Sequence, residues 1–190
     1  MQQPQSQTKF ISNINFANNK LAEDECEEYT FSICDFSNVD LSKIIFSNCI
    51  FIECNFSMTK INNTAFRNIQ FIDCKLLGIH FDYCKQLLFE VSFTGCILNL
   101  SSFYKMKLKN THFINSTLHE VDFAEADLSN ALFANCDMKG SMFENTIIEK
   151  ADFKTAYNFS INPEINRVKG AKFSLPGLSG LLDKYGLEIE

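Results

Sequence analysis

The chain has no tryptophan, no run of about 18 apolar residues and no Gly-rich phosphate loop. The missing apolar run excludes a membrane-spanning helix. The opening residues, MQQPQSQTKF, also lack the apolar segment of a secretory signal, so we expect a cytoplasmic protein. Without a phosphate loop or a dinucleotide fingerprint, the sequence gives no support to a nucleotide-binding fold.

What the chain does have is enough apolar material for one domain. Its 190 residues are 46% hydrophobic, and they include 20 Phe and 8 Cys. A chain of this length and composition can bury a real core. The Phe and Cys residues follow one pattern along the sequence, and that pattern decides the expected fold.

A large apolar residue returns at every fifth position. In the segment 123–153, FAEADLSNALFANCDMKGSMFENTIIEKADF, these central residues are Phe123, Leu128, Phe133, Met138, Phe143, Ile148 and Phe153. A helix would repeat at about 3.6 residues and a half-buried strand at about 2, so neither explains a period of five. Sixteen of the 20 Phe are central residues, which random placement would not produce.

The repeat has two phases. One runs from Ile11 to Phe81 and the other from Leu88 to Phe153, and they differ by two residues. An insertion is therefore expected between Phe81 and Leu88, where Gln86 occupies the expected central position. Two positions before each centre the residues are mostly small or β-branched, and the remaining three of every five are mostly polar. This pattern predicts that each unit of five forms one short wall of a solenoid, with two side chains inward and three in water.

Several units match the motif of a known family, namely CDFSN at 34–38, VDLSK at 39–43, VDFAE at 121–125 and ADLSN at 126–130. They resemble the pentapeptide-repeat proteins, and the resemblance covers roughly residues 11–155. It implies an all-β fold, a right-handed quadrilateral β-helix with four walls per coil of 20, in which residues 20 apart stack at ~4.8 Å. The predicted structural core includes Phe93, Phe103, Phe113, Phe123, Phe133, Phe143 and Phe153.

Three regions are expected: an N-terminal tail at 1–10, the β-helix at 11–155 with a break near 82–88, and a C-terminal loop and helix at 156–190. Pro176 can open a short helix and Gly186 can close it. A strand-like stretch follows at 187–189. This segment resembles the dimerisation module of topoisomerase-binding family members, which implies a homodimer. The candidate interface is Leu178, Leu181, Leu182 and Tyr185.

No residue set indicates catalysis or a metal. Seven of the eight Cys lie two positions before a central residue, and none forms a CxxC pair, so we expect buried free thiols and no zinc site. His80, His112 and His119 occupy outward positions in separate parts of the chain. A filled rod offers no concavity in which catalytic groups converge. We therefore expect no enzyme activity and no cofactor.

The break has its own resemblance. The stretch LLGIHFDYCKQLLFEVSF, 76–93, is similar to a segment of the Qnr-type quinolone-resistance proteins, in which a Leu-Gly-Ile is followed by a Cys. Gly78 and Cys84 match that pattern. In those proteins the Gly marks the junction of two stacks, which makes Gly78 a candidate hinge. A simple bulge would also need only a Gly and spare chain.

Charge is unevenly distributed around the net value of −6. Residues 116–153 carry eight acidic and two basic groups, whereas 58–109 carry three acidic and seven basic groups, including Lys105, Lys107 and Lys109. Resemblance to the gyrase-binding members implies an acidic rod in the DNA site of a type II topoisomerase, with no direct contact to nucleic acid or membrane. The candidate partner-binding residues are Asp122, Glu125, Asp127, Glu144, Glu149 and Asp152. A general protein-interaction scaffold, with its acidic groups serving solubility, is the alternative.

Overall fold

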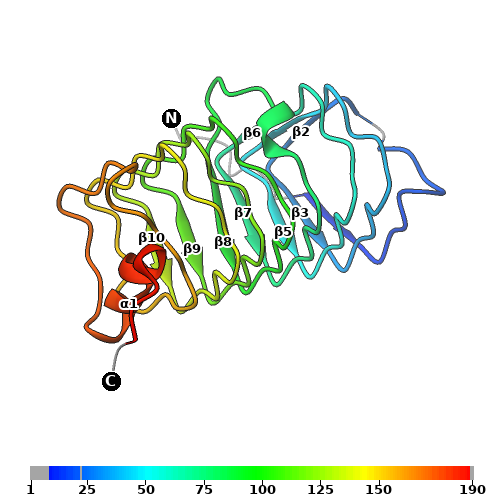
Figure 1. The fold of residues 1–190 in the computed structure, drawn as a ribbon. Helices are drawn as coiled ribbons and strands as arrows, with labels where there is room; N and C mark the ends of the chain where they lie inside the picture. The colour runs from blue at the N-terminus through cyan, green and yellow to red at the C-terminus, as the bar shows by residue number, and fades with distance from the viewer. Residues whose placement is uncertain (1–8, 22, 189–190) are drawn as a thin grey trace, which may run out of the picture.

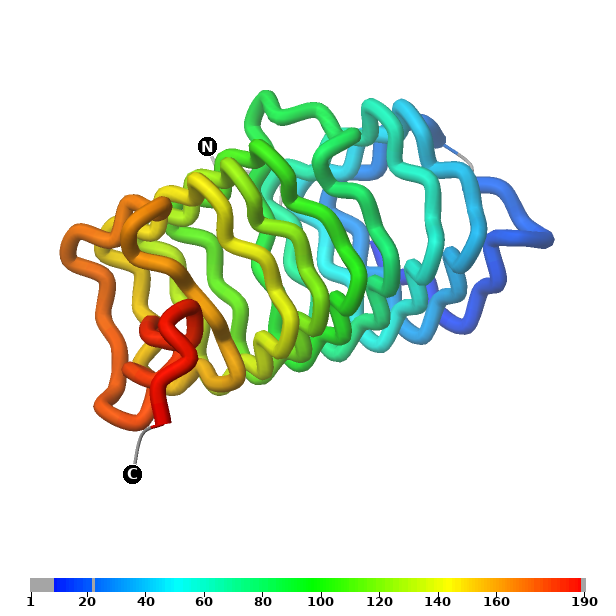
Figure 2. The backbone as a smooth tube through the Cα atoms, in the orientation of Figure 1, coloured from blue at the N-terminus to red at the C-terminus, as the bar shows by residue number. Residues whose placement is uncertain are grey.

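A computed structural model describes residues 9–21 and 23–188, which form a four-sided β-solenoid (Figure 1). Its strands are β1 (Lys9–Ser12), β2 (Glu25–Glu27), β3 (Tyr29–Ser32), β4 (Ile45–Ser47), β5 (Ile50–Ile52), β6 (Ala65–Arg67), β7 (Ile69–Ile72), β8 (Val91–Thr94), β9 (His112–Ile114) and β10 (Leu132–Ala134). Figure 2 shows successive coils following one another along the rod. In the described part of the chain, no helix is long and apolar enough to cross a membrane.

The pairing register confirms a coil of 20 residues. Each paired strand is parallel to the next, and Phe31 pairs with Phe51 and Phe51 with Phe71. Across the break the step becomes 22, because Phe71 pairs with Phe93. It returns to 20 from Phe93 to Phe113. The two extra residues are therefore absorbed within one coil.

The coils stack into four walls, which we number in chain order. Wall 1 holds β1, β3, β5, β7, β8, β9 and β10 in one seven-stranded sheet, and wall 4 holds β2, β4 and β6. In walls 2 and 3, isolated bridges join each coil to the next, such as Asp35 with Asn55 in wall 2 and Ser102 with Asp122 in wall 3. Bridges between Ile147 and Arg167 and between Asp152 and Lys172 carry the stacking past residue 155.

The interior is filled by stacked side chains, as predicted. All seven predicted core phenylalanines are buried, with at most 4% of their surface exposed. Within a wall the rings lie nearly parallel, for example Phe113 and Phe133 at 4.9 Å and 1°. Between walls they meet edge to face, as Phe113 and Phe123 do at 5.9 Å and 84°. The quadrupoles of the aromatic rings favour both arrangements.

Most units of five end at a corner whose residue adopts the left-handed conformation. This corner residue lies two positions after the central one, as Asn38, Asn68 and Asn130 do with φ between 53° and 58°. Asn tolerates this region better than most residues, and Gly adopts it freely. The recurrence of Asn and Gly at this position therefore has a backbone cause.

A short helical segment covers the C-terminal end of the rod. It contains a 3-10 turn (Pro176–Leu178), α1 (Ser179–Leu182) and a second 3-10 turn (Asp183–Tyr185). Pro176 opens it and Gly186 ends it with φ of 60°, as predicted. The predicted strand is wrong for residues 187–188, which are irregular, and Ile189 lies outside the described residues. Those two residues have no neighbouring strand to supply backbone hydrogen bonds.

Candidate protein-binding surfaces

Most of the inward Ser, Thr and Cys residues form a hydrogen bond to a carbonyl of the coil before them. Thr59 Oγ1 donates to the Phe36 carbonyl at 2.7 Å, and Cys136 Sγ donates to the Phe113 carbonyl at 3.3 Å. Ser, Thr and Cys therefore suit this position because they are small and can satisfy a buried carbonyl. All eight cysteines are free and buried, which agrees with the expectation of unpaired thiols.

Burial also raises the pKa of several of these thiols, which keeps them protonated. It raises the pKa of Cys136 to about 11 and that of Cys26 to about 12. A protonated thiol is a poor nucleophile and a poor metal ligand. Among the described residues, no group of three or more His, Cys, Asp or Glu side chains is placed to hold a metal ion.

The three histidines lie on three different walls. His80 on wall 3 is 3.3 Å from Asp82, and His119 on wall 2 is 2.9 Å from Asp137. His112 points outward from β9 on wall 1. These distances and positions describe separate surface contacts. The candidate binding surfaces of the described chain are its outer walls, its break and its C-terminal cap.

The six candidate acidic residues all point outward, but they are spread over three walls. Asp122, Glu125 and Glu144 belong to wall 3 or its corner, Asp127 and Glu149 to wall 4, and Asp152 to wall 1. Stacking therefore brings together only those acids that lie on one wall. The structure does not gather all six into a single patch.

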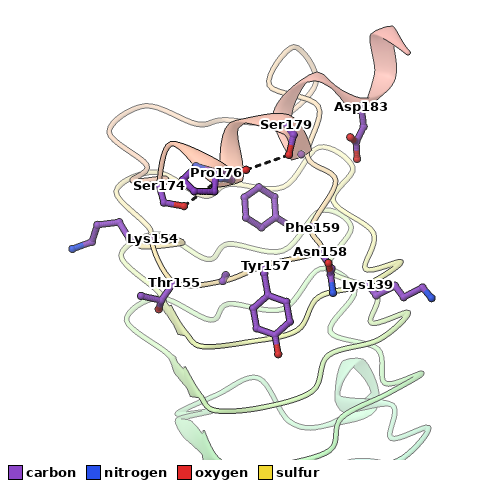
Figure 3. A pocket seen from close by; sticks show the side chains of 13 residues that line it. Lys139, Lys154, Thr155, Tyr157, Asn158, Phe159, Ser174, Pro176, Ser179 and Asp183 are labelled. Atoms are coloured by element: carbon purple, nitrogen blue, oxygen red, sulfur yellow. Dashed lines mark hydrogen bonds between the residues drawn. The ribbon is translucent and has the colours of Figure 1, made fainter. Parts of the chain in front are cut away.

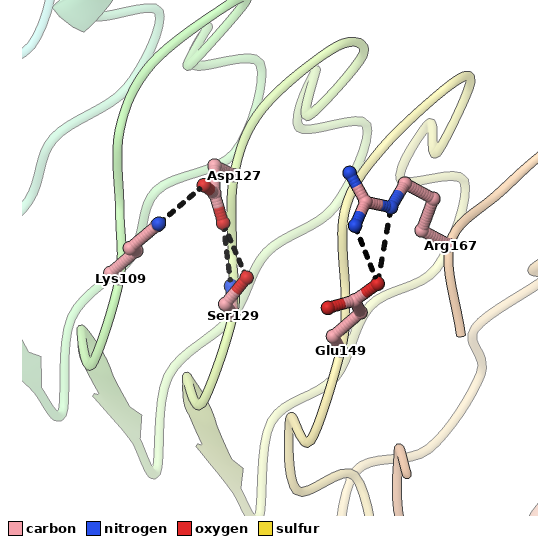
Figure 4. A network of polar contacts seen from close by, with 5 residues as sticks. All are labelled: Lys109, Asp127, Ser129, Glu149 and Arg167. Carbon is pink, nitrogen blue, oxygen red and sulfur yellow. Dashed lines mark hydrogen bonds and ion pairs between the residues drawn. The ribbon is translucent and has the colours of Figure 1, made fainter. Parts of the chain in front are cut away.

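Four of the six carboxylates have cationic neighbours on the rod itself. The ion pairs are Lys105 with Glu125 at 3.4 Å, Lys109 with Asp127 at 3.2 Å, Lys154 with Asp152 at 3.3 Å and Arg167 with Glu149 at 2.8 Å. Two of these pairs are shown in Figure 4. Asp122 and Glu144 form no ion pair with any described residue within 4.0 Å. Wall 3 therefore carries the least compensated acidic charge of the set.

The environment of Asp127 shows how local bonds hold such a carboxylate ionised. Burial would raise its pKa, but hydrogen bonds from Ser129 and the neighbouring Lys109 outweigh that effect and keep the pKa below its usual value. The Ser129 hydroxyl donates to Asp127 Oδ1 at 2.6 Å. Asp127 is therefore charged at neutral pH, with Lys109 compensating part of that charge.

The break forms a projecting loop at residues 84–90, seen above the rod near β6 in Figure 1. Our prediction that Leu88 is a central core residue is wrong, because Leu88 is 66% exposed and takes a corner conformation with φ of 61°. Phe89 packs against the core instead. Leu87 is 75% exposed, so the loop presents two apolar side chains to solvent. The two spare residues thus produce a larger surface feature than their number suggests.

Gly78 lies before this loop in an ordinary corner position. Its φ is 63°, and the equivalent corners in the neighbouring coils, Met58 and Leu100, have φ of 58° and 62°. A Cβ at Gly78 would lie 2.8 Å from Met58 Sδ, so glycine also makes room for that side chain. Bridging continues beyond it, between His80 and Ser102. A hinge at Gly78 stays a prediction.

The C-terminal cap carries the predicted apolar stripe in two parts. Leu181 packs against the core, whereas Leu178, Leu182 and Tyr185 are 42%, 36% and 53% exposed. Gly180 lies directly on Phe159, where a Cβ would be 2.2 Å from the Phe159 carbonyl oxygen. A groove of about 730 Å³ lies between this segment and the last coils (Figure 3). The exposed half of the stripe is free to contact another molecule.

Comparison with known proteins assigns the repeat to a family. The family profile "Pentapeptide repeat region" matches residues 86–157, and "Pentapeptide repeats (8 copies)" matches residues 31–68. Together the matched segments make up more than half of the chain. The chain therefore belongs to the pentapeptide-repeat family, as its filled four-sided solenoid and its coil of 20 indicate. No curated protein sequence matches it significantly.

Two solved structures are similar over most of their length. A trypsin-treated form of QnrB1, a plasmid-mediated fluoroquinolone resistance protein, has a TM-score of 0.51 at 20% identity, covering 96% of this chain and 98% of that one. HetL, a pentapeptide-repeat protein involved in heterocyst differentiation regulation in the cyanobacterium Nostoc, also has a TM-score of 0.51, at 14% identity, covering 87% and 84%. At these identities the similarity shows the fold alone.

Proposed function

We propose that this chain is a non-enzymatic binding protein that occupies the DNA site of a type II topoisomerase, DNA gyrase or topoisomerase IV, and thereby modulates quinolone sensitivity. The observation that carries the proposal is the outward acidic series of residues 116–153, eight acidic and two basic groups on the walls of a filled rod. A rod with acidic walls suits a site that binds the phosphate backbone of DNA. The fold shared with QnrB1, a fluoroquinolone resistance protein, supports the proposed link to quinolone sensitivity.

The ion pairs predict which wall of the rod contributes most to such binding. Because Lys105, Lys109 and Arg167 compensate nearby carboxylates, the rod is not a uniform copy of a phosphate backbone. Binding should therefore depend most on wall 3, where Asp122 and Glu144 are not paired. An electrostatic contact at exposed groups should also weaken as the ionic strength rises.

A gyrase supercoiling assay with and without ciprofloxacin tests the proposal. We expect the wild-type chain to inhibit supercoiling or to relieve inhibition by the drug, with a larger effect at low salt. The variant Asp122→Asn, Glu125→Gln, Glu144→Gln, whose three residues all lie on wall 3 or its corner, should lose most of the effect.

A matched control removes the same charge from other coils. Asp35→Asn, Glu53→Gln, Asp73→Asn neutralises three outward acidic groups on wall 2 and at the corners of wall 1 in the first half of the chain, and should keep the effect. The topoisomerase proposal would be refuted by a wild-type chain that neither inhibits nor protects the enzyme and does not bind it. Equal losses in the two triple variants would refute the wall 3 site.

A second candidate function is a general protein-interaction scaffold or regulatory module with no topoisomerase role. Two observations favour it: four of the six candidate carboxylates are paired on the chain itself, and HetL has the same fold similarity as QnrB1 with a different role. A scaffold of this kind should show no inhibition or protection of gyrase at any salt concentration.

We also propose that two copies of the chain pair end to end through the C-terminal segment. The exposed Leu178, Leu182 and Tyr185, together with Leu175 at 84% exposure, support an apolar contact at the capped end. Leu178→Asp with Leu182→Asp should reduce the mass measured by light scattering, because each places a charge in that contact. A wild-type mass of one chain at micromolar concentration would refute the pairing.

A further inference from the structure

Wall 1 differs from the other walls in the side chains that it presents to solvent. In β3, β5 and β7 to β10, the residues on either side of each central Phe point outward. They are Thr30, Ser32, Ile50, Ile52, Gln70, Ile72, Ser92, Thr94, His112, Ile114, Leu132 and Ala134. None is Asp, Glu, Lys or Arg, and each is half-buried or exposed.

The other walls carry charge over the same coils. Wall 4 presents Arg67, Lys109 and Asp127, and wall 3 presents Lys60 and Asp122. The chain as a whole has a formal net charge of −6. The absence of charge is therefore a property of β3 to β10 of wall 1, and the same wall becomes charged beyond β10, at Asp152 and Lys172.

The uncharged residues also form a continuous apolar row. Strand pairing places Ile52 beside Ile72, Ile72 beside Thr94, Thr94 beside Ile114 and Ile114 beside Ala134. The row therefore crosses five neighbouring coils of the seven-stranded sheet, whose strands follow one another along the rod in Figure 1. Flat sheets with aliphatic and β-branched outer residues pack well against a second sheet about 10 Å away.

We propose that wall 1 is a self-association surface, on which two copies of the chain pack sheet against sheet. The occupant is a second copy because a partner for β3 to β10 of wall 1 has to be flat, uncharged and aliphatic along one row, and this part of the wall has these properties itself. Two chains of net charge −6 repel one another, and β3 to β10 of wall 1 are where they can approach without opposing carboxylates on the strand faces. This contact is separate from the C-terminal contact and does not depend on a topoisomerase partner.

The size of the wall predicts a reversible contact. Six strands, β3, β5 and β7 to β10, at ~4.8 Å spacing and five residues at ~3.3 Å give a face of roughly 30 by 15 Å, or about 900 Å² over two copies. Specific interfaces of this area lie at the weak end of the observed range. The association should therefore depend on protein concentration between about 1 and about 100 µM.

Sedimentation velocity on four proteins tests the inference. The parent is the Leu178→Asp, Leu182→Asp variant, in which the C-terminal contact is disabled, and it should approach twice the chain mass of 21.7 kDa as its concentration rises. Adding Ile72→Lys and Ile114→Lys should return the mass to one chain, because two charges are placed in the apolar row. The milder pair Ile72→Thr and Ile114→Thr keeps β-branched residues and should weaken association by roughly tenfold.

The matched control places the same charges on other walls. Ile97 on wall 2 and Ile147 on wall 4 are also outward aliphatic residues, so Ile97→Lys with Ile147→Lys should leave the parent's association unchanged. Far-ultraviolet circular dichroism and urea midpoints should show that all four proteins are folded. A parent that stays at one chain mass to about 100 µM would overturn the proposal, as would association that both wall 1 pairs leave intact.

Discussion

Replacement of Phe123 by Ala is the perturbation that probes the filled interior most directly. Phe123 has 0% exposure and stacks on Phe103 at 5.5 Å and on Phe143 at 5.2 Å. It also meets Phe113 and Phe133 edge to face, both at 5.9 Å. Rings fixed by strand pairing above and below cannot move into the space left by the missing ring.

The loss should be large because transfer, cavity and ring contacts all contribute. Removing a buried Phe costs about 3 to 5 kcal/mol, and the four ring contacts place Phe123 in the upper half of that range. At about 4 kcal/mol, a chain of this size should lose roughly 8 to 16 °C in melting temperature.

Urea titration followed by circular dichroism measures this loss in the Leu178→Asp, Leu182→Asp background at about 1 µM, where the C-terminal contact is disabled and the weak wall 1 contact is dissociated. The control is Phe10→Ala, which makes the same chemical change at a residue that is 66% exposed. The control should lose less than about 1 kcal/mol. A loss below about 1 kcal/mol for Phe123→Ala, or equal losses in the two variants, would refute the filled interior.

Four further predictions concern buried polar groups and the cap. A thiol reagent at pH 8 should label none of the eight cysteines within minutes in the native chain and all eight after denaturation, because all are buried; rapid native labelling would contradict this. The free energy of unfolding should fall as pH rises above 9.0. Burial raises the pKa of Cys136 to about 11, so the folded thiol stays protonated while the unfolded thiol ionises. If Cys136→Ala left the slope of the free energy of unfolding against pH unchanged, this explanation would be contradicted. Thr146→Val removes a donor to the buried Phe123 carbonyl and should lower the free energy of unfolding in urea by about 1 to 3 kcal/mol. The control Thr117→Val, at an outward threonine, should lower it by under about 0.5 kcal/mol. Equal losses would refute the role of the Thr146 hydrogen bond. Gly180→Ala should expose residues 176–188 to trypsin, because a Cβ would lie 2.2 Å from the Phe159 carbonyl oxygen; unchanged cleavage would count against this packing.

The repeat could be predicted from the sequence because the inward position of each unit admits few residue types. Phe103, Phe113 and Phe123 are ten apart along the chain, and that spacing alone places them on opposite walls. The sequence also marks the corners, but the polarity of these residues alone does not reveal their backbone conformation. Asn38 and Asn68 recur two positions after the centre because the backbone there is left-handed.

The sequence locates the break but does not determine the conformation of its loop. Leu87, Leu88 and Phe89 are all large and apolar, so hydrophobicity does not say which one points inward. The outcome depends on where the backbone absorbs the two spare residues, and it places Phe89 inward and Leu88 at a corner. The ion pairs could not be predicted from the sequence either, because Lys109 and Asp127 come into contact only when the coils stack.

The measurement that tests the proposed function most directly is binding of DNA gyrase to the immobilised chain in competition with duplex DNA. If the rod occupies the DNA site, gyrase should bind saturably, duplex DNA should displace it, and binding should weaken between about 50 and about 200 mM salt. Binding that duplex DNA cannot displace, or no binding at about 10 µM enzyme, would contradict occupation of the DNA site.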